Sequence, residues 1–247
     1  MHSPYMKKVP GGKRAVLCIH GFLGSPAHFK PFYDAVPEEM SVYSLLLDGH
    51  GGTTKDFGAS SMEKWKTQVQ EGLAYLSDTY EEIYIVGHSM GTLLAITLAP
   101  LFPKVRGLFL LAVPLKIRVG LSAVQNSLKA CFGKHRAEDA VGKAYAAAHS
   151  VTLSKNPFSY ITWLPRYLDL FRLSKKARED IKHISLPCRI FQSEKDELVS
   201  ARSALFIPEK ENFTVSVLPS GRHFIYTAEN TKTLKNELHL FLKGEEA

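Results

Sequence analysis

Long apolar runs, paired cysteines and repeated segments are all missing from this sequence. No apolar run approaches the roughly 18 residues that a membrane-spanning helix needs. The amino-terminal stretch has an apolar run only at 15–19, shorter than the roughly 7–15 residues of a signal-peptide core, so we expect a cytoplasmic protein. Without repeats or long linkers, 247 residues with 45% hydrophobic content suit one large α/β domain or a domain with an insertion.

Cysteine is also scarce, which limits the chemistry that the chain can carry. Cys18, Cys131 and Cys188 are the three cysteines, an odd number with wide spacing, so neither a disulfide framework nor a zinc site is indicated. We expect all three to be reduced, and their apolar surroundings do not favour a nucleophilic thiol. The glycine-rich stretch at 45–54 lacks both phosphate-binding patterns, and we predict no metal and no cofactor.

The charge is uneven along the chain. The net charge is +7, and the segment 115–185 holds thirteen basic residues against five acidic ones, so the excess lies in this segment. No nucleic-acid-binding motif accompanies it, and the basic residues are spread over several predicted helices, so we exclude nucleic acid as a partner. We interpret the charges as a solvated face. The alternative is attraction of anionic substrates or weak association with an anionic lipid surface.

Short apolar runs alternate with helical stretches. The runs do not alternate apolar with polar residues, which predicts strands buried on both faces, at 15–20, 42–47, 83–87, 105–113, 188–192 and 213–218. Helical stretches are predicted at 26–36, 61–80, 92–102, 201–207 and 231–242. This order predicts a mostly parallel sheet with helices on both faces.

One segment interrupts the alternation. Between 115 and 185 the sequence predicts helices without a strand, at 121–131, 138–149, 158–171 and 174–184. We therefore divide the chain into a core of 1–114 with 186–247 and an inserted helical cap of 115–185. Such an insertion emerges at the carboxyl edge of the sheet, where ligands bind in α/β folds.

A glycine-bounded serine follows the third apolar run. Gly87-His88-Ser89-Met90-Gly91 fits G-x-S-x-G, with a strand before it and a helix after it. Such a turn pushes the serine hydroxyl into a cleft, and the helix amino terminus favours a developing anion. The other interpretation is a tight turn that happens to contain a serine. The strand–helix context favours a nucleophile.

A serine needs a base, and the base needs an orienting acid. His223 is the histidine that follows the last predicted strand, so a candidate base follows the serine by a long stretch of chain, with room for an acid between them. The loop after the run at 188–192 offers Glu194, Asp196 and Glu197, of which we favour Asp196. Without the serine and the histidine, each acid would be interpreted as a solvated charge on a loop.

Two backbone N–H groups are candidates for stabilising an oxyanion. His20-Gly21 places a flexible turn directly before Phe22, whose N–H could face the substrate together with that of Met90. We expect His20 to brace this loop rather than transfer protons. His88 adjoins the serine, but neighbours on a strand face opposite ways, which excludes it as the base.

These motifs together resemble the α/β-hydrolase superfamily, and more narrowly small bacterial carboxylesterases and monoacylglycerol lipases with a short helical cap. The residues that carry the resemblance are His20-Gly21-Phe22, Asp48-Gly49-His50-Gly51, Gly87-His88-Ser89-Met90-Gly91, Asp196 and His223. It extends from 15 to 242 and is weakest in the cap. It implies a Ser89–His223–Asp196 triad, an oxyanion hole from Phe22 and Met90, and a sheet of six to seven strands. Ser193 departs from the Gly that commonly precedes the acid.

The function that the resemblance implies is a serine carboxylesterase acting through an acyl-enzyme on Ser89. Its substrates would be short- to medium-chain acyl esters or monoacylglycerol-type esters. A serine peptidase or amidase, or a thioesterase or acyltransferase, could use the same triad. A non-catalytic binder would be expected to have lost a triad member, and none is lost. The aromatic-rich stretch at 156–171 either attaches the cap to the core or lines an acyl pocket, with Phe22, Trp163 and Phe158 as candidate pocket residues.

Overall fold

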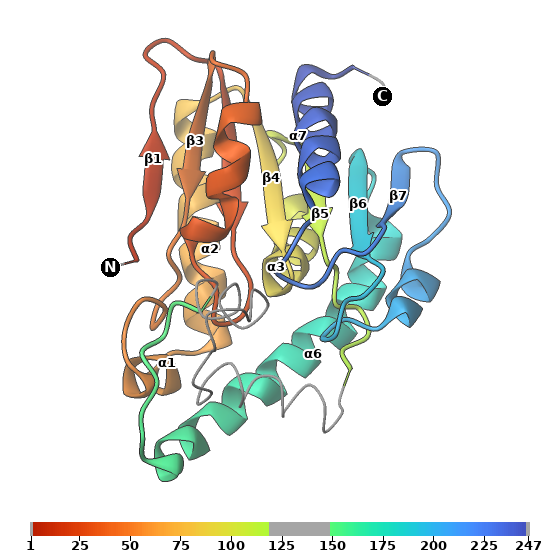
Figure 1. The fold of residues 1–247 in the computed structure, drawn as a ribbon. Coiled ribbons are helices and arrows are strands. Elements are labelled where there is room, and N and C mark those ends of the chain that lie inside the picture. The colour runs from red at the N-terminus through yellow and green to blue at the C-terminus, as the bar shows by residue number, and fades with distance from the viewer. Residues whose placement is uncertain (1, 119–148, 246–247) are drawn as a thin grey trace.

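The computed structural model describes residues 2–118 and 149–245. Its strands form one seven-stranded sheet in the order β1-β3-β2-β4-β5-β6-β7 (Figure 1). The strands are β1 Tyr5–Lys7, β2 Arg14–Ile19, β3 Met40–Ser44, β4 Glu82–His88, β5 Val105–Leu111, β6 Cys188–Ser193 and β7 Phe213–Leu218. β1 pairs with β3 antiparallel and every other pairing is parallel, which confirms the predicted mostly parallel sheet of six to seven strands.

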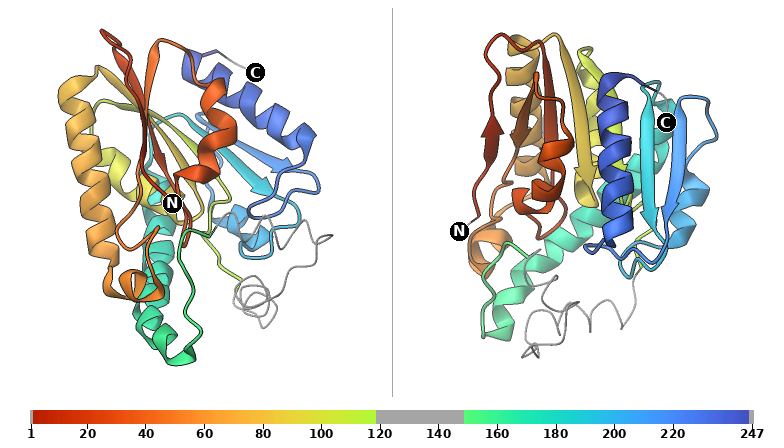
Figure 2. Two further views of the ribbon diagram at one scale, coloured as in Figure 1. Left: turned by 60° about the vertical axis from the view of Figure 1, so that its left-hand side comes forward. Right: turned by 45° about the horizontal axis from the view of Figure 1, so that its top comes forward.

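Helices cover both faces of this sheet, as predicted (Figure 2). The α-helices are α1 Thr54–Ala59, α2 Met62–Thr79, α3 Met90–Leu98, α6 Leu164–Asp180 and α7 Ala228–Lys243. The 3-10 helices are η1 Pro26–Ala35, η2 Ala99–Leu101, η3 Pro157–Trp163, η4 Ile181–His183 and η5 Ala201–Phe206.

The hydrophobic core has two parts, one on each face of the sheet, because the side chains of a strand point alternately to its two faces. Leu17 and Ile19 of β2 pack into the core beneath α2, α3 and α6, whereas Val16 and Cys18 pack beneath η1 and α7. Successive side chains of a strand point to opposite faces, so a strand between two layers must be apolar at every position. The central strands therefore have the continuous apolar runs from which the sheet was predicted.

β7 departs from the expectation that every strand is buried on both faces. Val215 is 45% exposed and Val217 is 64% exposed. The reason is position: β7 is the last strand in the sheet and pairs only with β6. Its sequence also differs from the central strands, because polar Thr214 and Ser216 alternate with apolar residues, so the expectation of a continuous apolar run was wrong here. One edge of β7 has no neighbouring strand within the described residues.

The cap is continuous where the sequence predicted a break. The predicted helices at 158–171 and 174–184 are one run of η3, α6 and η4, and α6 passes through Leu173 and Ser174 (Figure 1). Both of these residues are buried, and the Ser174 hydroxyl donates to the Pro114 carbonyl at 2.6 Å. The helix predicted at 121–131 lies outside the described residues, as does that at 138–149 except for His149.

α6 runs below the carboxyl ends of the strands (Figure 1). Its amino-terminal part is linked to α1, because Arg166 donates to the carbonyl of Gly58 at 3.1 Å. Its middle part packs on α3. Within the described part of the chain, none of the helices has the length and apolar character that crossing a membrane requires.

Candidate active site

Ser89 lies in the turn between β4 and α3, with φ 51° and ψ −120°. Residues with a β-carbon rarely adopt this backbone conformation. The turn also leaves no space for side chains at its flanks. A β-carbon on Gly87 would lie 2.9 Å from the backbone of Thr92, and one on Gly91 would collide with the carbonyl of Ile19. The two glycines of the motif are therefore a steric requirement of the sharp strand-to-helix turn.

Three side chains from three strand ends form one hydrogen-bonded chain. The Oγ of Ser89 lies 3.1 Å from Nε2 of His223, and Nδ1 of His223 lies 2.8 Å from Oδ2 of Asp196. A carboxylate can only accept, so Nδ1 of His223 carries the proton and Nε2 presents a lone pair to the serine hydroxyl. The residues follow β4, β6 and β7 and have the arrangement of a serine hydrolase triad.

Asp196 is buried and fixed from two sides. Its Oδ1 accepts from the N–H groups of Leu198 at 2.8 Å and Val199 at 2.7 Å, while Oδ2 faces the imidazole. Together these bonds set the plane of the carboxylate. The other two acids of the loop bind main chain instead: Glu194 accepts from Ser220 N–H at 2.8 Å, and Glu197 accepts from His223 N–H at 3.4 Å.

The loop after β2 lies directly against Ser89. A β-carbon on Gly21 would stand 2.9 Å from the β-carbon of Ser89, so the main chain at 21 passes within contact of the serine. The next residue is Phe22. In the described part of the chain, the N–H groups of Phe22 and Met90 have no protein acceptor.

His20 braces this loop. Its Nδ1 donates to the Gly21 carbonyl at 2.9 Å, and its Nε2 accepts from the Leu47 N–H at 3.1 Å. Both ring nitrogens are satisfied in one neutral tautomer. Burial lowers the pKa of His20 to about 4, which keeps the ring uncharged at neutral pH.

The residues 16–233, which include every member of this hydrogen-bonded chain, match the alpha/beta hydrolase family. The chain belongs to that family. The thermostable monoacylglycerol lipase of Bacillus sp. (strain H-257) is 26% identical over 196 residues, covering 78% of this chain and 74% of that protein. The carboxylesterase of Bacillus subtilis (strain 168) is 29% identical over 110 residues, 44% of each protein.

A solved structure supports the same fold assignment. A structure reported for LipS and LipT, two metagenome-derived lipolytic enzymes, superposes on this alpha/beta hydrolase with a TM-score of 0.72. It covers 98% of this chain and 97% of that one at 19% identity. At this identity the likeness establishes the fold alone.

The candidate pocket residues of this hydrolase lie in different environments. The ring of Phe22 contacts those of Phe57 and Tyr167, each at 5.0 Å between centroids. Trp163 is buried behind Phe57, at 4.8 Å between ring centroids, and its Nε1 donates to the Thr54 carbonyl at 2.8 Å. Phe158 is 74% exposed at the start of η3.

The described thiols of this hydrolase lie away from the triad. Cys18 and Cys188 are buried and unpaired, and burial raises the pKa of both, that of Cys188 to about 12. Cys131 lies outside the described residues. Among the described residues, no group of three or more His, Cys, Asp or Glu is arranged to hold a metal ion.

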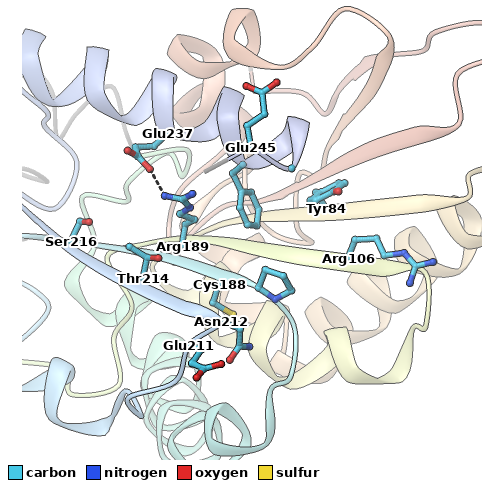
Figure 3. A pocket seen from close by; sticks show the side chains of 13 residues that line it. Tyr84, Arg106, Cys188, Arg189, Glu211, Asn212, Thr214, Ser216, Glu237 and Glu245 are labelled. Carbon is cyan, nitrogen blue, oxygen red and sulfur yellow. Dashed lines mark hydrogen bonds and ion pairs between the residues drawn. The ribbon is translucent and has the colours of Figure 1, made fainter. Parts of the chain in front are cut away.

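A hollow of about 590 Å³ lies near the amino ends of strands (Figure 3), whereas the triad residues follow the carboxyl ends of β4, β6 and β7. It is bounded by the amino ends of β5, β6 and β7 and by the carboxyl end of α7, as Arg106, Cys188 and Glu245 show. Its polar wall is occupied by an ion pair between Arg189 and Glu237 at 2.8 Å. No triad residue lines it, so the hollow plays no part in the site described above.

Proposed function

We propose that this alpha/beta hydrolase is a serine carboxylesterase that hydrolyses carboxylic esters of short- to medium-chain or monoacylglycerol type. The observation that carries the proposal is the unbroken hydrogen-bonded chain from Ser89 through His223 to Asp196. The chain stands beside a loop that contacts the nucleophile. The distant homology to a monoacylglycerol lipase and a carboxylesterase supports ester substrates.

The proposed reaction has two acyl-transfer steps. Ser89 gives its proton to Nε2 of His223 while Oγ attacks the ester carbonyl. His223 then protonates the leaving alcohol, which separates from the acyl group now bound to Ser89. Water, deprotonated by His223, attacks this acyl-enzyme and breaks the bond between the acyl group and Oγ. His223 returns the proton to Ser89, and the carboxylic acid leaves. Asp196 holds the imidazole in the required tautomer and stabilises its charged form.

The N–H groups of Phe22 and Met90 are proposed as the oxyanion hole. Phe22 directly follows the glycine that contacts Ser89, and Met90 begins α3 immediately after Ser89. Donors preorganised toward the developing oxyanion act more strongly in a site that excludes water. The ring of Phe22 is proposed as one wall of the acyl pocket, with Trp163 supporting it from behind through Phe57.

The test is hydrolysis of p-nitrophenyl esters and 1-monoacylglycerols of graded chain length by the wild type, Ser89→Ala and Ser77→Ala. We expect Ser89→Ala to lose activity by at least about 10³-fold and Ser77→Ala, on the distant helix α2, to keep it. Near-normal rates in Ser89→Ala would refute the nucleophile. Faster turnover of matched thioesters or anilides would instead favour the thioesterase or amidase alternative.

We also propose that the cap associates with anionic lipid surfaces. Large apolar side chains are exposed in one strip along η3 and α6: Phe158 74%, Ile161 59%, Leu164 61%, Tyr167 37%, Leu168 54% and Phe171 37%. Exposed apolar side chains that follow one another along a helix often mark a surface that contacts lipid or protein. Arg172, Lys175 and Lys176 are exposed further along α6, so apolar and basic side chains share the helix, a combination that suits an anionic interface.

Vesicle sedimentation tests this association, with vesicles of phosphatidylcholine alone and with added phosphatidylglycerol. We expect binding to the anionic vesicles that weakens as salt rises from about 0.05 to 0.5 M. Leu164→Ser with Leu168→Ser should weaken it, whereas Leu205→Ser should not, since Leu205 is 80% exposed on η5, outside the strip. An equal loss of vesicle binding in both variants, or binding that does not change with salt concentration, would contradict the proposal.

A further inference from the structure

The main chain of His223 is held at both of its polar groups. His88 Nε2 lies 2.9 Å from the His223 carbonyl oxygen in a buried contact, and Glu197 Oε2 accepts from the His223 N–H at 3.4 Å. His88 directly precedes the nucleophile Ser89, and Glu197 directly follows the acid Asp196. The residues next to Ser89 and Asp196 in the sequence thus bind the backbone of His223.

The protonation state of His88 follows from its partner. A carbonyl oxygen only accepts, so Nε2 of His88 carries the proton. Burial, followed by the neighbouring His28 and His223, lowers the pKa of His88 well below the ordinary value of 6.5, and the ring is neutral. Its Nδ1 therefore has a lone pair, which finds no donor among the described residues. The ring can support His223 as a donor without placing a second positive charge beside an imidazolium.

Covalent adjacency makes these contacts geometrically consequential. His88 and Ser89 share one peptide bond at the end of β4. A shift of the His223 backbone relative to His88 therefore also moves the His223 imidazole relative to Ser89 and changes the distance from His223 Nε2 to Ser89 Oγ, now 3.1 Å. The ring of His88 has little freedom to follow such a shift. It lies against the tilted ring of His28 at 3.9 Å between centroids, and its Nδ1 would be 3.2 Å from a β-carbon on Gly21.

We propose that His88 is a positioning residue, assisted by Glu197, that fixes the main chain of His223 and thereby sets the contact between the base and the nucleophile. This inference rests on the proposed function for the roles of Ser89 and His223. His88 is a variable position of the G-x-S-x-G motif, and the motif alone does not predict that its side chain binds the His223 main chain. The shorter and more deeply buried contact makes His88 the stronger of the two supports.

Variants of His88 distinguish the effect of its hydrogen bond to His223 from the effect of its ring packing against His28. His88→Phe keeps a ring against His28 but cannot donate. His88→Gln and His88→Met are of similar length, and only the glutamine can donate to the His223 carbonyl. His28→Phe is the packing control, because His28 contacts the same ring without bonding to the triad. Glu197→Gln retains an acceptor for the His223 N–H, whereas Glu197→Leu does not.

Steady-state ester hydrolysis is the first measurement. We expect kcat to fall about 10- to 100-fold in His88→Phe and His88→Met with KM changed less than about 3-fold, because small misplacement of a catalytic group costs this much. His88→Gln should recover most of the rate, and His28→Phe should stay within about 3-fold of the wild type. Glu197→Leu should lose less than His88→Met, with Glu197→Gln close to the wild type.

A second measurement does not depend on the natural substrate. The rate of Ser89 labelling by a fluorophosphonate reports the activated serine directly, and it should fall in the same order as kcat. A third is the proton NMR resonance of the His223 Nδ1–H bonded to Asp196, identified by its loss in His223→Ala. It should shift or broaden in His88→Met and not in His88→Gln. Thermal midpoints of all variants show which of them fold.

Equal rates in His88→Gln and His88→Met would overturn the proposal, as would labelling within about 2-fold of the wild type in His88→Met. A fall in the thermal midpoint with unchanged labelling would reduce His88 to a structural residue. If the wild type is labelled but hydrolyses no ester, the ester assignment fails while labelling still decides the role of His88. If the wild type is not labelled either, the proposal that Ser89 is a nucleophile fails, and the NMR resonance of His223 then decides whether His88 positions His223.

Discussion

Gly21 and Ser89 approach so closely that a β-carbon on Gly21 would stand 2.9 Å from the β-carbon of Ser89. Side-chain carbons do not normally approach to this distance, so the loop after β2 and the nucleophile turn can meet only if one of them lacks a side chain. The same β-carbon would lie 3.2 Å from Nδ1 of His88. Gly21 is therefore the point where the loop proposed to carry an oxyanion donor meets both Ser89 and His88.

Gly21→Ala should impair the reaction more than the fold. The added methyl group must push the loop away from Ser89, displacing the Phe22 N–H, and loss of one oxyanion donor costs about 10²- to 10³-fold in kcat. The measurement is kcat and KM with a p-nitrophenyl ester. Gly72→Ala is the matched control, since a β-carbon there meets its nearest neighbour at 3.6 Å, an ordinary contact. Equal activity in the two variants would contradict the close approach at Gly21.

Asp196→Asn should leave the shape of the site intact and remove the charge that orients His223. The amide can place an N–H against Nδ1 and so favour the wrong tautomer, for which a loss of about 10⁴-fold in kcat is expected. Stopped-flow or steady-state hydrolysis at neutral pH measures this. Glu194→Gln, an exposed acid on the same loop, should cost less than about 3-fold. A small loss in Asp196→Asn would point to another orienting group.

Trp163→Phe should destabilise the protein by about 1–3 kcal/mol, because the Thr54 carbonyl loses the donor that now lies 2.8 Å from it in a buried contact. Phe158→Ala should change the free energy of unfolding by less than about 0.5 kcal/mol, since that ring is 74% exposed. Urea unfolding followed by fluorescence or circular dichroism gives both values. A larger effect at Phe158 than at Trp163 would contradict a stabilising role for the buried contact between Trp163 and Thr54.

Stability should fall as pH is lowered from about 6.5 toward 4, because buried histidines bind protons only when the chain unfolds. Burial lowers the pKa of His20 to about 4 and that of His50 well below its ordinary value. Between the folded and unfolded pKa values the unfolded state holds the extra proton, so each such histidine adds up to about 1.4 kcal/mol per pH unit to the slope.

His50→Gln isolates one of these contributions. Nδ1 of His50 lies 3.2 Å from the Leu47 carbonyl, to which a glutamine amide could also donate, but glutamine does not titrate. Denaturant titrations at several pH values should give a shallower slope for His50→Gln than for His183→Gln, a change at an exposed position. Identical slopes would mean that His50 is protonated in the folded state.

Sequence order was sufficient to predict the fold and the hydrogen-bonded chain, for an identifiable reason. The strands that carry Ser89, Asp196 and His223 are parallel, so their carboxyl ends meet at one edge whatever the intervening residues are. Buried central strands also have distinctive apolar runs. The glycines of the serine turn were predictable because a sharp turn excludes side chains.

What the sequence could not predict depends on neighbours far along the chain. His88 was excluded as the base from strand geometry, but its bond to the His223 carbonyl spans 135 positions and depends on which way one peptide faces. The continuity of α6 goes with the burial of Leu173 and Ser174, where the Ser174 hydroxyl donates to the Pro114 carbonyl sixty positions away. The exposure of Val215 and Val217 depends on β7 being last in the sheet, and an apolar run does not show where in a sheet it lies.

The backbone of Ser89, at φ 51° and ψ −120°, implies that thermal stability and the proposed activity conflict at this position. Residues held in such sparsely populated regions cost about 1–3 kcal/mol each. Glycine would relieve that strain, so Ser89→Gly should raise the melting temperature while removing the nucleophile. Thermal stability and the proposed reactivity of Ser89 therefore make opposite demands on the backbone at this position.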